Sequence, residues 1–454
     1  MSDISKDARI CIIGAGPAGL SAGMYLEQKG YENYTILERE DHVGGKCHSP
    51  EYNGRRYEMG AIMGVPSYYA VHDIEKFCGF THDGPKLNRN YKNLKGDVIE
   101  LFAPKKNPLR VPHLLKMRSQ MKKFAELLET KYKGYDINGH RGVSEGRYDG
   151  YAVTPEREKV SGVNENLKDL ALPFNEFCRI NGVDLVKEIW IGPFTSFGYG
   201  YFDEIPAAYV LKYLDFQTTM NFVNVNLWTW KDGTQSIYER LNAKLKHAAR
   251  LNSNITKVER KDDKVFVTVN GEVEEYDYII VTAPLQYLPD YFDADANEKE
   301  LFSKITYEMY DVLAFTTKPE DHPEISYYIF ENMEKERYGH LMVYYRRWHD
   351  DNTQMLTTYA LRNHTGDPEI PYDTCKETVL EDLKEMHNPA EKVHYEKDWY
   401  YFPHVDSKTY ASGWYEKVEG MQGNKNTFYA GEVMSFGDMD ETCEYSRELV
   451  DRFF

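Results

Sequence analysis

The chain of 454 residues lacks the features of membrane-spanning, disulfide-linked and nucleic-acid-binding proteins. It has no apolar run near the length that a bilayer span requires, and no charged-then-apolar leader at its start. Its six cysteines are scattered without a close pair, which predicts neither a disulfide framework nor a zinc site. The net charge of −18 argues against a nucleic-acid partner. We therefore expect a cytoplasmic protein with reduced thiols.

Motifs of hydrolytic and metal-dependent catalysis are also missing. The sequence contains no G-x-S-x-G elbow, no H-E-x-x-H run and no His/Cys cluster with metal-ligand spacing. No metal is predicted, and no catalytic side chain can be named. Because an acidic protein repels anions at long range, an anionic substrate would need a local basic anchor. The length predicts two or three domains, and 41% hydrophobic with 28% charged residues is an ordinary globular composition.

The first strong signal is a dinucleotide fingerprint near the N-terminus. The apolar run ICII, residues 10–13, predicts a buried strand and leads directly into GAGPAG. Gly14 allows a tight turn, Gly16 lets a pyrophosphate approach the backbone, and Gly19 lets helix and strand pack closely. The strand YTILE then ends at Glu38, an acid suited to accept hydrogen bonds from a ribose diol. The order of strand, glycines, helix, strand and acid favours an adenosine cofactor without a 2′-phosphate.

A second glycine cluster follows in EREDHVGGKCHSPEYNGRRYEMGA. A nicotinamide domain has no need of it, whereas an extended FAD needs more backbone close to its pyrophosphate and ring. Gly44 and Gly45 would offer N–H groups unshielded by side chains, and Lys46 a phosphate counter-charge. Gly60 and Ala61 would let the backbone pass beneath the flavin ring. The predicted cofactor is therefore FAD.

These segments resemble the FAD-dependent amine oxidase and phytoene desaturase superfamily. EMGA matches its acid-x-Gly-Ala run, whereas Lys46 stands where the superfamily usually has Arg. The segment NITKVERKDDKVFVTVNGEVEEYDYIIVTAPL reads as a hairpin and a buried strand, and the resemblance implies that Ile255 holds the adenine through its backbone. In NTFYAGEVMSFG the resemblance implies that Glu432 binds the ribitol.

The C-terminal segment MDETCEYSRELVDRFF predicts a helix whose first N–H groups face the flavin. Asp438, Asp440 and Glu441 crowd its start. Carboxylates there would oppose an anionic reduced flavin, so we expect all three to point away.

The fold class expected is α/β with α+β: a Rossmann-like FAD-binding domain, discontinuous in sequence, with a mixed-sheet substrate domain and a helical cap. No second G-x-G-x-x-G follows a strand, which argues against a separate NAD(P) domain. The apolar spacing over residues 114–128 predicts an amphipathic cap helix, or alternatively a lid that makes transient contact with a membrane surface. The predicted boundaries are 1–78, 206–289 and 415–454 for the FAD-binding domain, 79–205 for the cap with a polar insertion at 140–166, and 290–414 for the substrate domain.

Longer stretches resemble the bacterial flavin-dependent linoleic acid, or polyunsaturated fatty acid, isomerases. They include DGPKLNR, PAAYVLKYLDF, LWTWKDGTQ and GWYEKVEGMQGNKNTFYAGEVMSFG, and several lie outside any cofactor motif. The resemblance implies hydride transfer from the doubly allylic carbon of a free fatty acid to flavin N5 and back to another carbon. It further implies a trans-10,cis-12 product from linoleate, with Arg89 gripping the carboxylate and Phe222 at the same gate.

Two other functions remain open from the residues. The superfamily motifs also permit an FAD-dependent amine oxidase or polyene desaturase, either of which oxidises its substrate. A flavoprotein with a structural cofactor, or a lipid carrier, would be yellow without turnover. No partner protein is implied.

Overall fold

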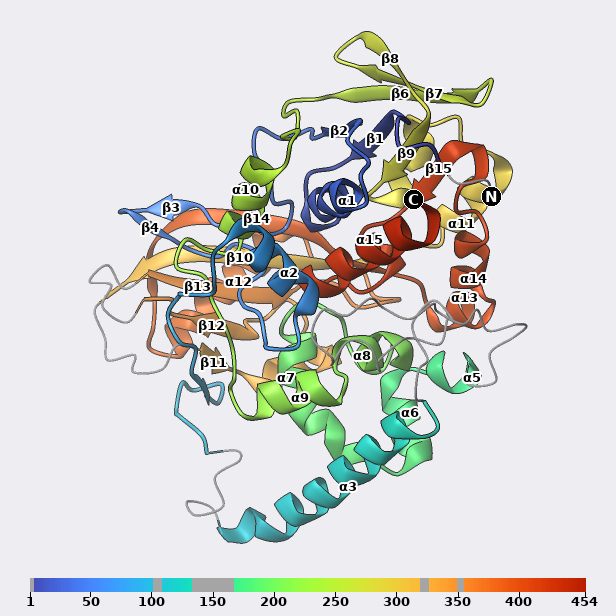
Figure 1. Ribbon diagram of the computed structural model, residues 1–454. Helices are drawn as coiled ribbons and strands as arrows, with labels where there is room; N and C mark the ends of the chain where they lie inside the picture. The colour runs from blue at the N-terminus through green and yellow to red at the C-terminus, as the bar shows by residue number, and fades with distance from the viewer. Residues whose placement is uncertain (1–3, 101–107, 133–166, 319–325, 349–354) are drawn as a thin grey trace.

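The computed structural model describes residues 4–100, 108–132, 167–318, 326–348 and 355–454. Its first layer is a four-stranded parallel sheet in the order β15-β9-β1-β2. The strands are β1 (Ile10–Ile13), β2 (Tyr34–Leu37), β9 (Tyr278–Val281) and β15 (Thr427–Tyr429). Because they come from three distant parts of the chain, the nucleotide-binding unit is discontinuous in sequence, as predicted (Figure 1).

Helices pack beside this sheet. α1 (Pro17–Gln28) starts with Pro17 in its first turn and packs along α15 (Met439–Phe453). Proline suits that position because its missing N–H has no partner there in any helix. α2 (Tyr69–Cys78) and α10 (Gln235–Lys244) complete this layer.

A small antiparallel sheet stands at the far end of this unit, at the top of Figure 1. It has three strands, β6 (Ile255–Lys261), β7 (Lys264–Val269) and β8 (Glu272–Tyr276), where the sequence indicated a hairpin. Asp262 and Asp263 form the first turn and Asn270 and Gly271 the second, all at positive φ. Such tight turns favour Asp, Asn and Gly because these residues tolerate the left-handed region.

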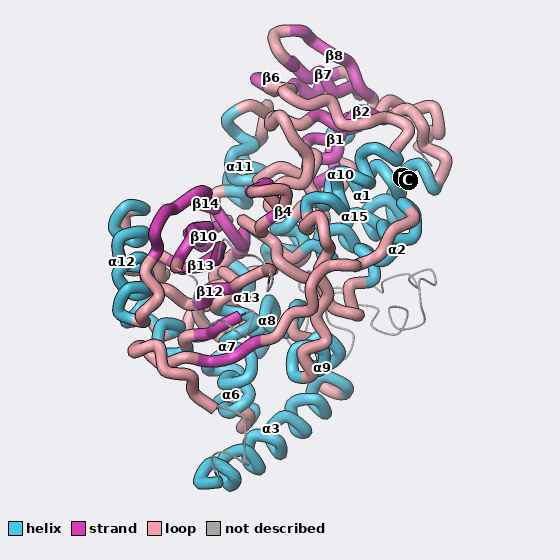
Figure 2. Tube along the Cα trace, turned by 90° about the vertical axis from the view of Figure 1, so that its left-hand side faces the viewer, coloured by secondary structure: helices cyan, strands magenta, loops and turns pink. Residues whose placement is uncertain are grey.

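The largest sheet has six strands, both parallel and antiparallel, in the order β14-β10-β13-β12-β11-β5 (Figure 2). Its strands are β5 (Arg89–Tyr91), β10 (Thr306–Thr317), β11 (Ser326–Tyr328), β12 (Val343–Tyr345), β13 (Met355–Leu361) and β14 (Ala390–His404). β13 is buried along its whole length, and α12 (Tyr372–Glu385) packs against β10 and β14. The mixed sheet predicted for the substrate domain is thus present. β5 extends it from inside the range 79–205, which the sequence assigned wholly to the cap.

Helices form the cap at the lower end of Figure 1. They are α3 (Val111–Glu129), α5 (Leu167–Leu170), α6 (Phe174–Asn181), α7 (Lys187–Thr195), α8 (Ala207–Tyr213) and α9 (Phe216–Val223). α8 packs on α5 and α6, and α9 on α7, so the cap continues past the predicted boundary at residue 205. The predicted insertion at 140–166 lies outside the described residues.

The remaining elements connect these layers: β3 (Glu51–Tyr52), β4 (Arg55–Arg56), α11 (Ala296–Phe302), α13 (Ser407–Ala411), α14 (Trp414–Glu419) and several 3-10 turns. Among the described helices, none combines the length and the apolar character needed to cross a bilayer.

Candidate active site

A cavity of about 740 Å³ extends from the carboxyl ends of the parallel strands to the mixed sheet. In doubly wound folds ligands bind at this edge, where the strand order reverses. Gly14 and Glu38 line one end of the cavity, and aromatic side chains from the cap and from β10 and β14 line the other. The cavity therefore reaches from the nucleotide-binding motif to the mixed sheet.

The first glycine triplet shapes the turn at the cavity edge. Gly14 has φ +102°, and its N–H donates to the Leu37 carbonyl over 2.8 Å. A Cβ on Gly19 would lie 1.9 Å from the Gly14 carbonyl oxygen, so only glycine permits this contact between helix and turn. A Cβ on Gly16 would meet nothing closer than 3.8 Å, the Gly45 Cα. Gly16 lines the cavity, which leaves its missing side chain as room for a ligand.

Glu38 is held at the end of β2 by two backbone donors. One carboxylate oxygen accepts from the Ala15 N–H at 2.7 Å and the other from the Glu40 N–H at 2.9 Å. These bonds fix the carboxylate beside the glycine turn while it still lines the cavity. The position suits the predicted contact to a ribose, which remains a prediction.

Gly44 and Gly45, the second glycine cluster, differ in their positions, although the sequence predicted the same role for both. Gly44 does not line the cavity, and its N–H donates to the Ala15 carbonyl at 3.0 Å. Its φ of +114° places it in a turn where a Cβ would meet the Cys47 carbonyl at 2.6 Å. Gly44 is therefore a turn residue, and the expectation that its N–H faces the pyrophosphate is wrong. Gly45 does line the cavity. It lies close to Gly16, because a Cβ on Gly45 would be 3.3 Å from the Gly16 Cα.

Gly60 and Ala61 line the cavity beside Lys46. The Ala61 N–H donates to the Lys46 carbonyl at 3.1 Å, and a Cβ on Gly60 would lie 1.8 Å from that same oxygen. The backbone at Gly60 and Ala61 is thus in direct contact with the backbone at Lys46, and only glycine fits at residue 60. The passage of this backbone beneath a flavin ring stays a prediction.

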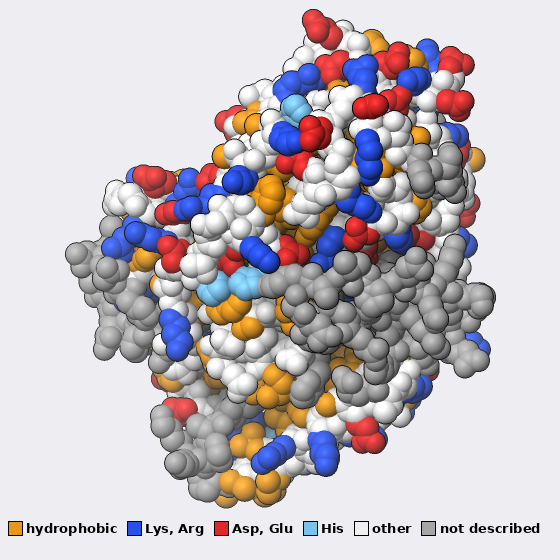
Figure 3. All heavy atoms as spheres, viewed as in Figure 1, with side chains coloured by type: hydrophobic (Ala, Val, Ile, Leu, Met, Phe, Trp, Pro, Cys, Tyr) orange, Lys and Arg blue, Asp and Glu red, His pale blue; other side chains and the backbone are white. Residues whose placement is uncertain are grey.

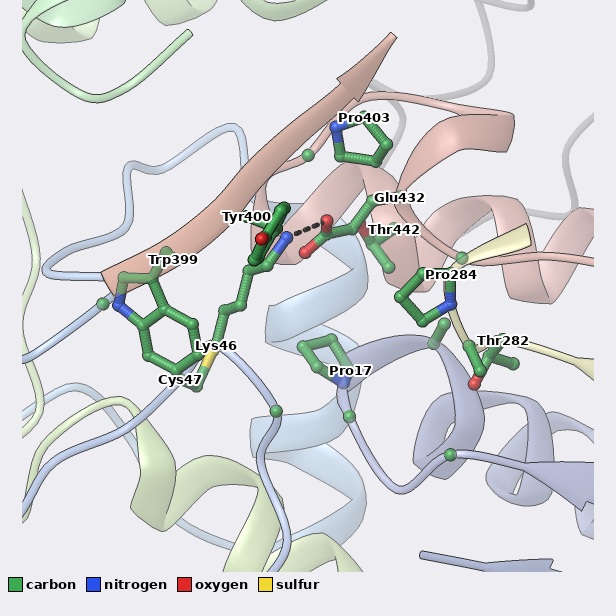
Figure 4. A pocket seen from close by; sticks show the side chains of 18 of the residues that line it. Pro17, Lys46, Cys47, Thr282, Pro284, Trp399, Tyr400, Pro403, Glu432 and Thr442 are labelled. Carbon is green, nitrogen blue, oxygen red and sulfur yellow. Dashed lines mark hydrogen bonds and ion pairs between the residues drawn. The ribbon is translucent and has the colours of Figure 1, made fainter. Parts of the chain in front are cut away.

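Lys46 and Glu432 meet across the cavity although 386 residues separate them. The Lys46 ammonium donates to the Glu432 carboxylate at 2.5 Å, as Figure 4 shows. The ammonium also lies 5.1 Å from the centre of the Tyr401 ring. Separate roles were predicted for the two residues, at phosphate and ribitol. The geometry joins them in one ion pair of the cavity wall.

The start of α15 forms part of the cavity wall through Asp438, Met439 and Thr442. Asp440 points away, accepting from the Val71 N–H at 3.0 Å, and Glu441 pairs with Lys212 at 2.7 Å. For these two residues the expectation is confirmed. Asp438 contradicts it, because it caps the helix through the Glu441 N–H and still lines the cavity. Burial, helped by the charges of Glu441 and Asp440, raises the pKa of Asp438 well above its usual range.

Tyrosines dominate the other end of the cavity. Ring centres lie 5.1 Å apart for Tyr199 and Tyr213, 5.6 Å for Tyr199 and Tyr401, and 5.1 Å for Tyr310 and Tyr401. Burial raises the pKa of each of these hydroxyls, so all four stay neutral. Gly198, at φ +88°, makes room for the wall: a Cβ there would lie 2.8 Å from both the Tyr310 and the Tyr401 ring.

Arg89 and Phe222 do not line the cavity, but the structure brings their segments together. A guanidinium nitrogen of Arg89 lies 3.4 Å from the carbonyl oxygen of Val223, the residue after Phe222. Phe222 is buried, with its ring centre 6.1 Å from that of Phe197, which does line the cavity. Phe222 therefore lies directly behind a residue of the cavity wall, and Arg89 contacts the backbone next to Phe222.

Of the other predicted residues, Ile255 lines the cavity near Glu38, where an adenine would lie. The sequence missed the four tyrosines as site residues, because an aromatic-rich stretch more often builds a core. For Tyr199 alone the sequence held a local signal, the glycines on either side of it in FGYGYF; both have positive φ in the structure.

The cavity fits an extended FAD on the residues present. Gly16 and Gly45 leave backbone exposed to it, Glu38 lies beside the glycine turn as a ribose partner, and the Lys46–Glu432 pair offers polar groups along the wall. The first turn of α15 faces the far part, where helix N–H groups suit a partial negative charge.

Comparison with known proteins agrees with this geometry. Residues 17–441 match the family described as flavin containing amine oxidoreductase. A crystal structure of a "CLA-producing fatty acid isomerase from P. acnes" is 51% identical, with a TM-score of 0.89 and 100% of both chains covered. The polyenoic fatty acid isomerase of Ptilota filicina is 24% identical over 276 residues, 57% of this chain and 51% of that protein, so the match spans about half of the relative. Cyclohexylamine oxidase from Brevibacterium oxydans IH-35A shares the fold, at 14% identity, a TM-score of 0.68 and 98% of each chain.

Proposed function

Because the chain belongs to the flavin-containing amine oxidoreductase family, and FAD is its cofactor, we propose that it is a fatty acid double-bond isomerase. Its substrate would be linoleic acid or a similar free polyunsaturated fatty acid, and its product a conjugated diene, trans-10,cis-12 from linoleate. The observation that carries this proposal is the 51% identity, over the whole of both chains, to the isomerase from P. acnes.

Held by the backbone at Gly16 and Gly45 and by Glu38, FAD would supply reversible hydride chemistry, which the proposed double-bond shift within one acyl chain requires. The four cavity tyrosines would supply the environment. Aromatic faces stabilise a cation delocalised over the diene. Their hydroxyls stay protonated because burial raises each pKa, so none is a phenolate that could remove a proton from that cation.

Asp438 supports the same reading. Burial, with the charges of Glu441 and Asp440, raises its pKa, which disfavours a carboxylate base at this end of the cavity.

Arg89 is the proposed anchor for the substrate carboxylate. It is partly exposed, and its guanidinium contacts the carbonyl of Val223, next to Phe222. A guanidinium can bind a carboxylate through two parallel hydrogen bonds. In a chain with a net charge of −18 such a local cation is what an anionic lipid requires.

The cap also carries an exposed apolar surface that a lipid membrane could contact. Leu109 is 91% exposed and Leu115 62% exposed, beside the exposed basic residues Lys116, Lys122 and Lys123 of α3. Orange apolar and blue basic side chains gather at this lower end of the molecule (Figure 3). We therefore include transient contact with an anionic membrane surface in the proposal. The six free cysteines support action in the cytoplasm, and nothing in the proposal requires a protein partner or nucleic acid.

An anaerobic incubation with linoleate tests the proposal. Catalytic growth of conjugated-diene absorbance, with the flavin spectrum returning to oxidised, is the expected result. Lasting flavin bleaching without conjugation would contradict isomerisation and favour a polyene desaturase. Peroxide release with an amine in air would favour an amine oxidase, and a yellow protein without turnover a structural flavin or lipid carrier.

A further inference from the structure

His72, Glu75 and His82 converge outside the cavity, on α2 and the loop that follows it. Gly79 ends α2 at φ +77°, and its N–H donates to the Glu75 carbonyl at 2.8 Å. This left-handed turn reverses the chain so that His82 returns over the helix. His72 Nδ1 lies 2.7 Å from a Glu75 carboxylate oxygen, and His82 Nδ1 lies 3.3 and 3.4 Å from the two oxygens.

The carboxylate at the centre of this cluster is buried and held in place. The Glu75 side chain is 3% exposed, and one oxygen accepts from the indole N–H of Trp230 at 2.8 Å. A buried carboxylate is costly unless hydrogen bonds or cations compensate it. Here one fixed donor orients it, and two imidazoles face it.

The imidazoles are held as well, and solvent reaches them. The His82 ring stacks on Trp228 with centres 3.6 Å apart and planes 4° apart, and the His72 ring lies 5.5 Å from Trp228. The His72 and His82 side chains are 37% and 25% exposed. One ligand atom from each of the three residues lies within 4.8 Å of the others.

We propose that His72, Glu75 and His82 bind one divalent transition-metal ion of the Zn²⁺ type. Two imidazole nitrogens and one carboxylate are a ligand set that Zn²⁺ accepts, with water completing the tetrahedron on the exposed side. The Trp230 N–H would then orient the metal-bound Glu75 carboxylate through its hydrogen bond, as partners of metal ligands commonly do. The spacing of these residues in the sequence predicts no such site, because the three ligands come together only through the turn at Gly79. Trp230, which orients Glu75, is more than 150 positions further along the chain.

Metal binding would stiffen one wall of the cavity. Gly64 and Trp228 exchange backbone hydrogen bonds of 2.9 and 2.7 Å, which ties the stretch that carries the cluster's two tryptophans to the segment just before α2. Met63 and Tyr68 of that segment line the cavity. An ion that links α2, its following loop and Trp230 through Glu75 therefore raises the stability of this wall, whatever reaction the cavity performs.

Titration of the chelator-treated, FAD-loaded full chain with ZnCl₂ tests the proposal by calorimetry. We expect one saturable site, a higher Tm with the ion, and quenching of tryptophan fluorescence by Ni²⁺, because Trp228 and Trp230 lie against the site. Co²⁺ at the same site would show visible bands of nitrogen and oxygen ligation.

Variants assign the site. His82→Ala and Glu75→Gln are each expected to weaken Zn²⁺ binding at least about tenfold, as even outer-sphere changes do at metal sites. His113→Ala is the matched control: that histidine is 36% exposed and pairs with one carboxylate, Glu188, at 2.8 Å. Cys78→Ser is a second control, because Cys78 ends α2. Circular dichroism and FAD content check the fold of each variant. No saturable binding, or equal affinity in wild type and in both cluster variants, would overturn the proposal.

Discussion

Glu58 and Arg347 form an ion pair of 2.9 Å in which both side chains are at most 1% exposed. Glu58 belongs to the EMGA run of the nucleotide-binding unit, and Arg347 follows β12 of the mixed sheet. The Ser49 hydroxyl and the Thr234 N–H also donate to this carboxylate. The acid that marks the superfamily motif therefore joins the cofactor unit to the substrate unit and does not line the cavity.

Removing one partner of this pair should destabilise the fold strongly. Glu58→Gln or Arg347→Met would leave a buried charge without its counter-ion, at a cost of about 3–5 kcal/mol. The double variant should lose less than the sum of the two single losses, because neither charge remains. Denaturant unfolding gives these free energies. Lys384→Met breaks the exposed Lys384–Glu381 pair and is the control, expected to change little. Single-variant losses as small as that of the control would contradict the prediction.

Substitutions at Gly16 and Gly60 should separate cofactor binding from folding. A Cβ at Gly16 meets no atom closer than 3.8 Å, so Gly16→Val should fold but fail to retain FAD. A Cβ at Gly60 would strike the Lys46 carbonyl at 1.8 Å, so Gly60→Ala should lower Tm as well. The flavin absorbance per chain and the melting curve of the purified variants measure both effects. A fully flavinated Gly16→Val protein would refute Gly16 as a contact of the cofactor.

The glycine motif, the parallel strands and the helical cap could be predicted because their signals are local in sequence. The Lys46–Glu432 contact could not, since residue spacing carries no information on partners 386 positions apart. Tyr199, Tyr310 and Tyr401 come from three separate segments, and each one alone is typical of a core residue. Gly44 was misassigned because a turn glycine and a ligand-facing glycine are identical in sequence.

Arg89→Ala should raise KM for linoleate by about 10-fold to 100-fold, the loss of a charge-assisted hydrogen bond, and lower kcat much less. The carboxylate lies far from the reacting carbons, so its anchor affects binding more than chemistry. Steady-state kinetics with Lys92→Ala as control measure this. Methyl linoleate has no carboxylate, and its kinetics should be nearly the same in wild type and in Arg89→Ala. Equal KM values for the free acid would remove Arg89 from the site.

The double change Leu109→Glu and Leu115→Glu should reduce binding to anionic phospholipid vesicles by about tenfold or more. Burial of each leucine contributes on the order of 1.5–3 kcal/mol. Vesicle co-sedimentation measures the effect at low salt. Val273→Glu, at a residue 66% exposed on β8 at the opposite end of the molecule, is the control and should bind as wild type does. Equal binding by the double variant and the control would exclude the start of α3 and the turn before it as the contact.

The fate of the hydrogen at the doubly allylic carbon tests the proposed reaction most directly. Linoleate deuterated at that carbon is converted in ordinary water, and the product is analysed by mass spectrometry and NMR. We predict that the deuterium is retained and reappears at a different carbon of the conjugated product. Loss of the label to solvent, with ordinary hydrogen in its place, would contradict an isomerisation by hydride transfer within one substrate molecule.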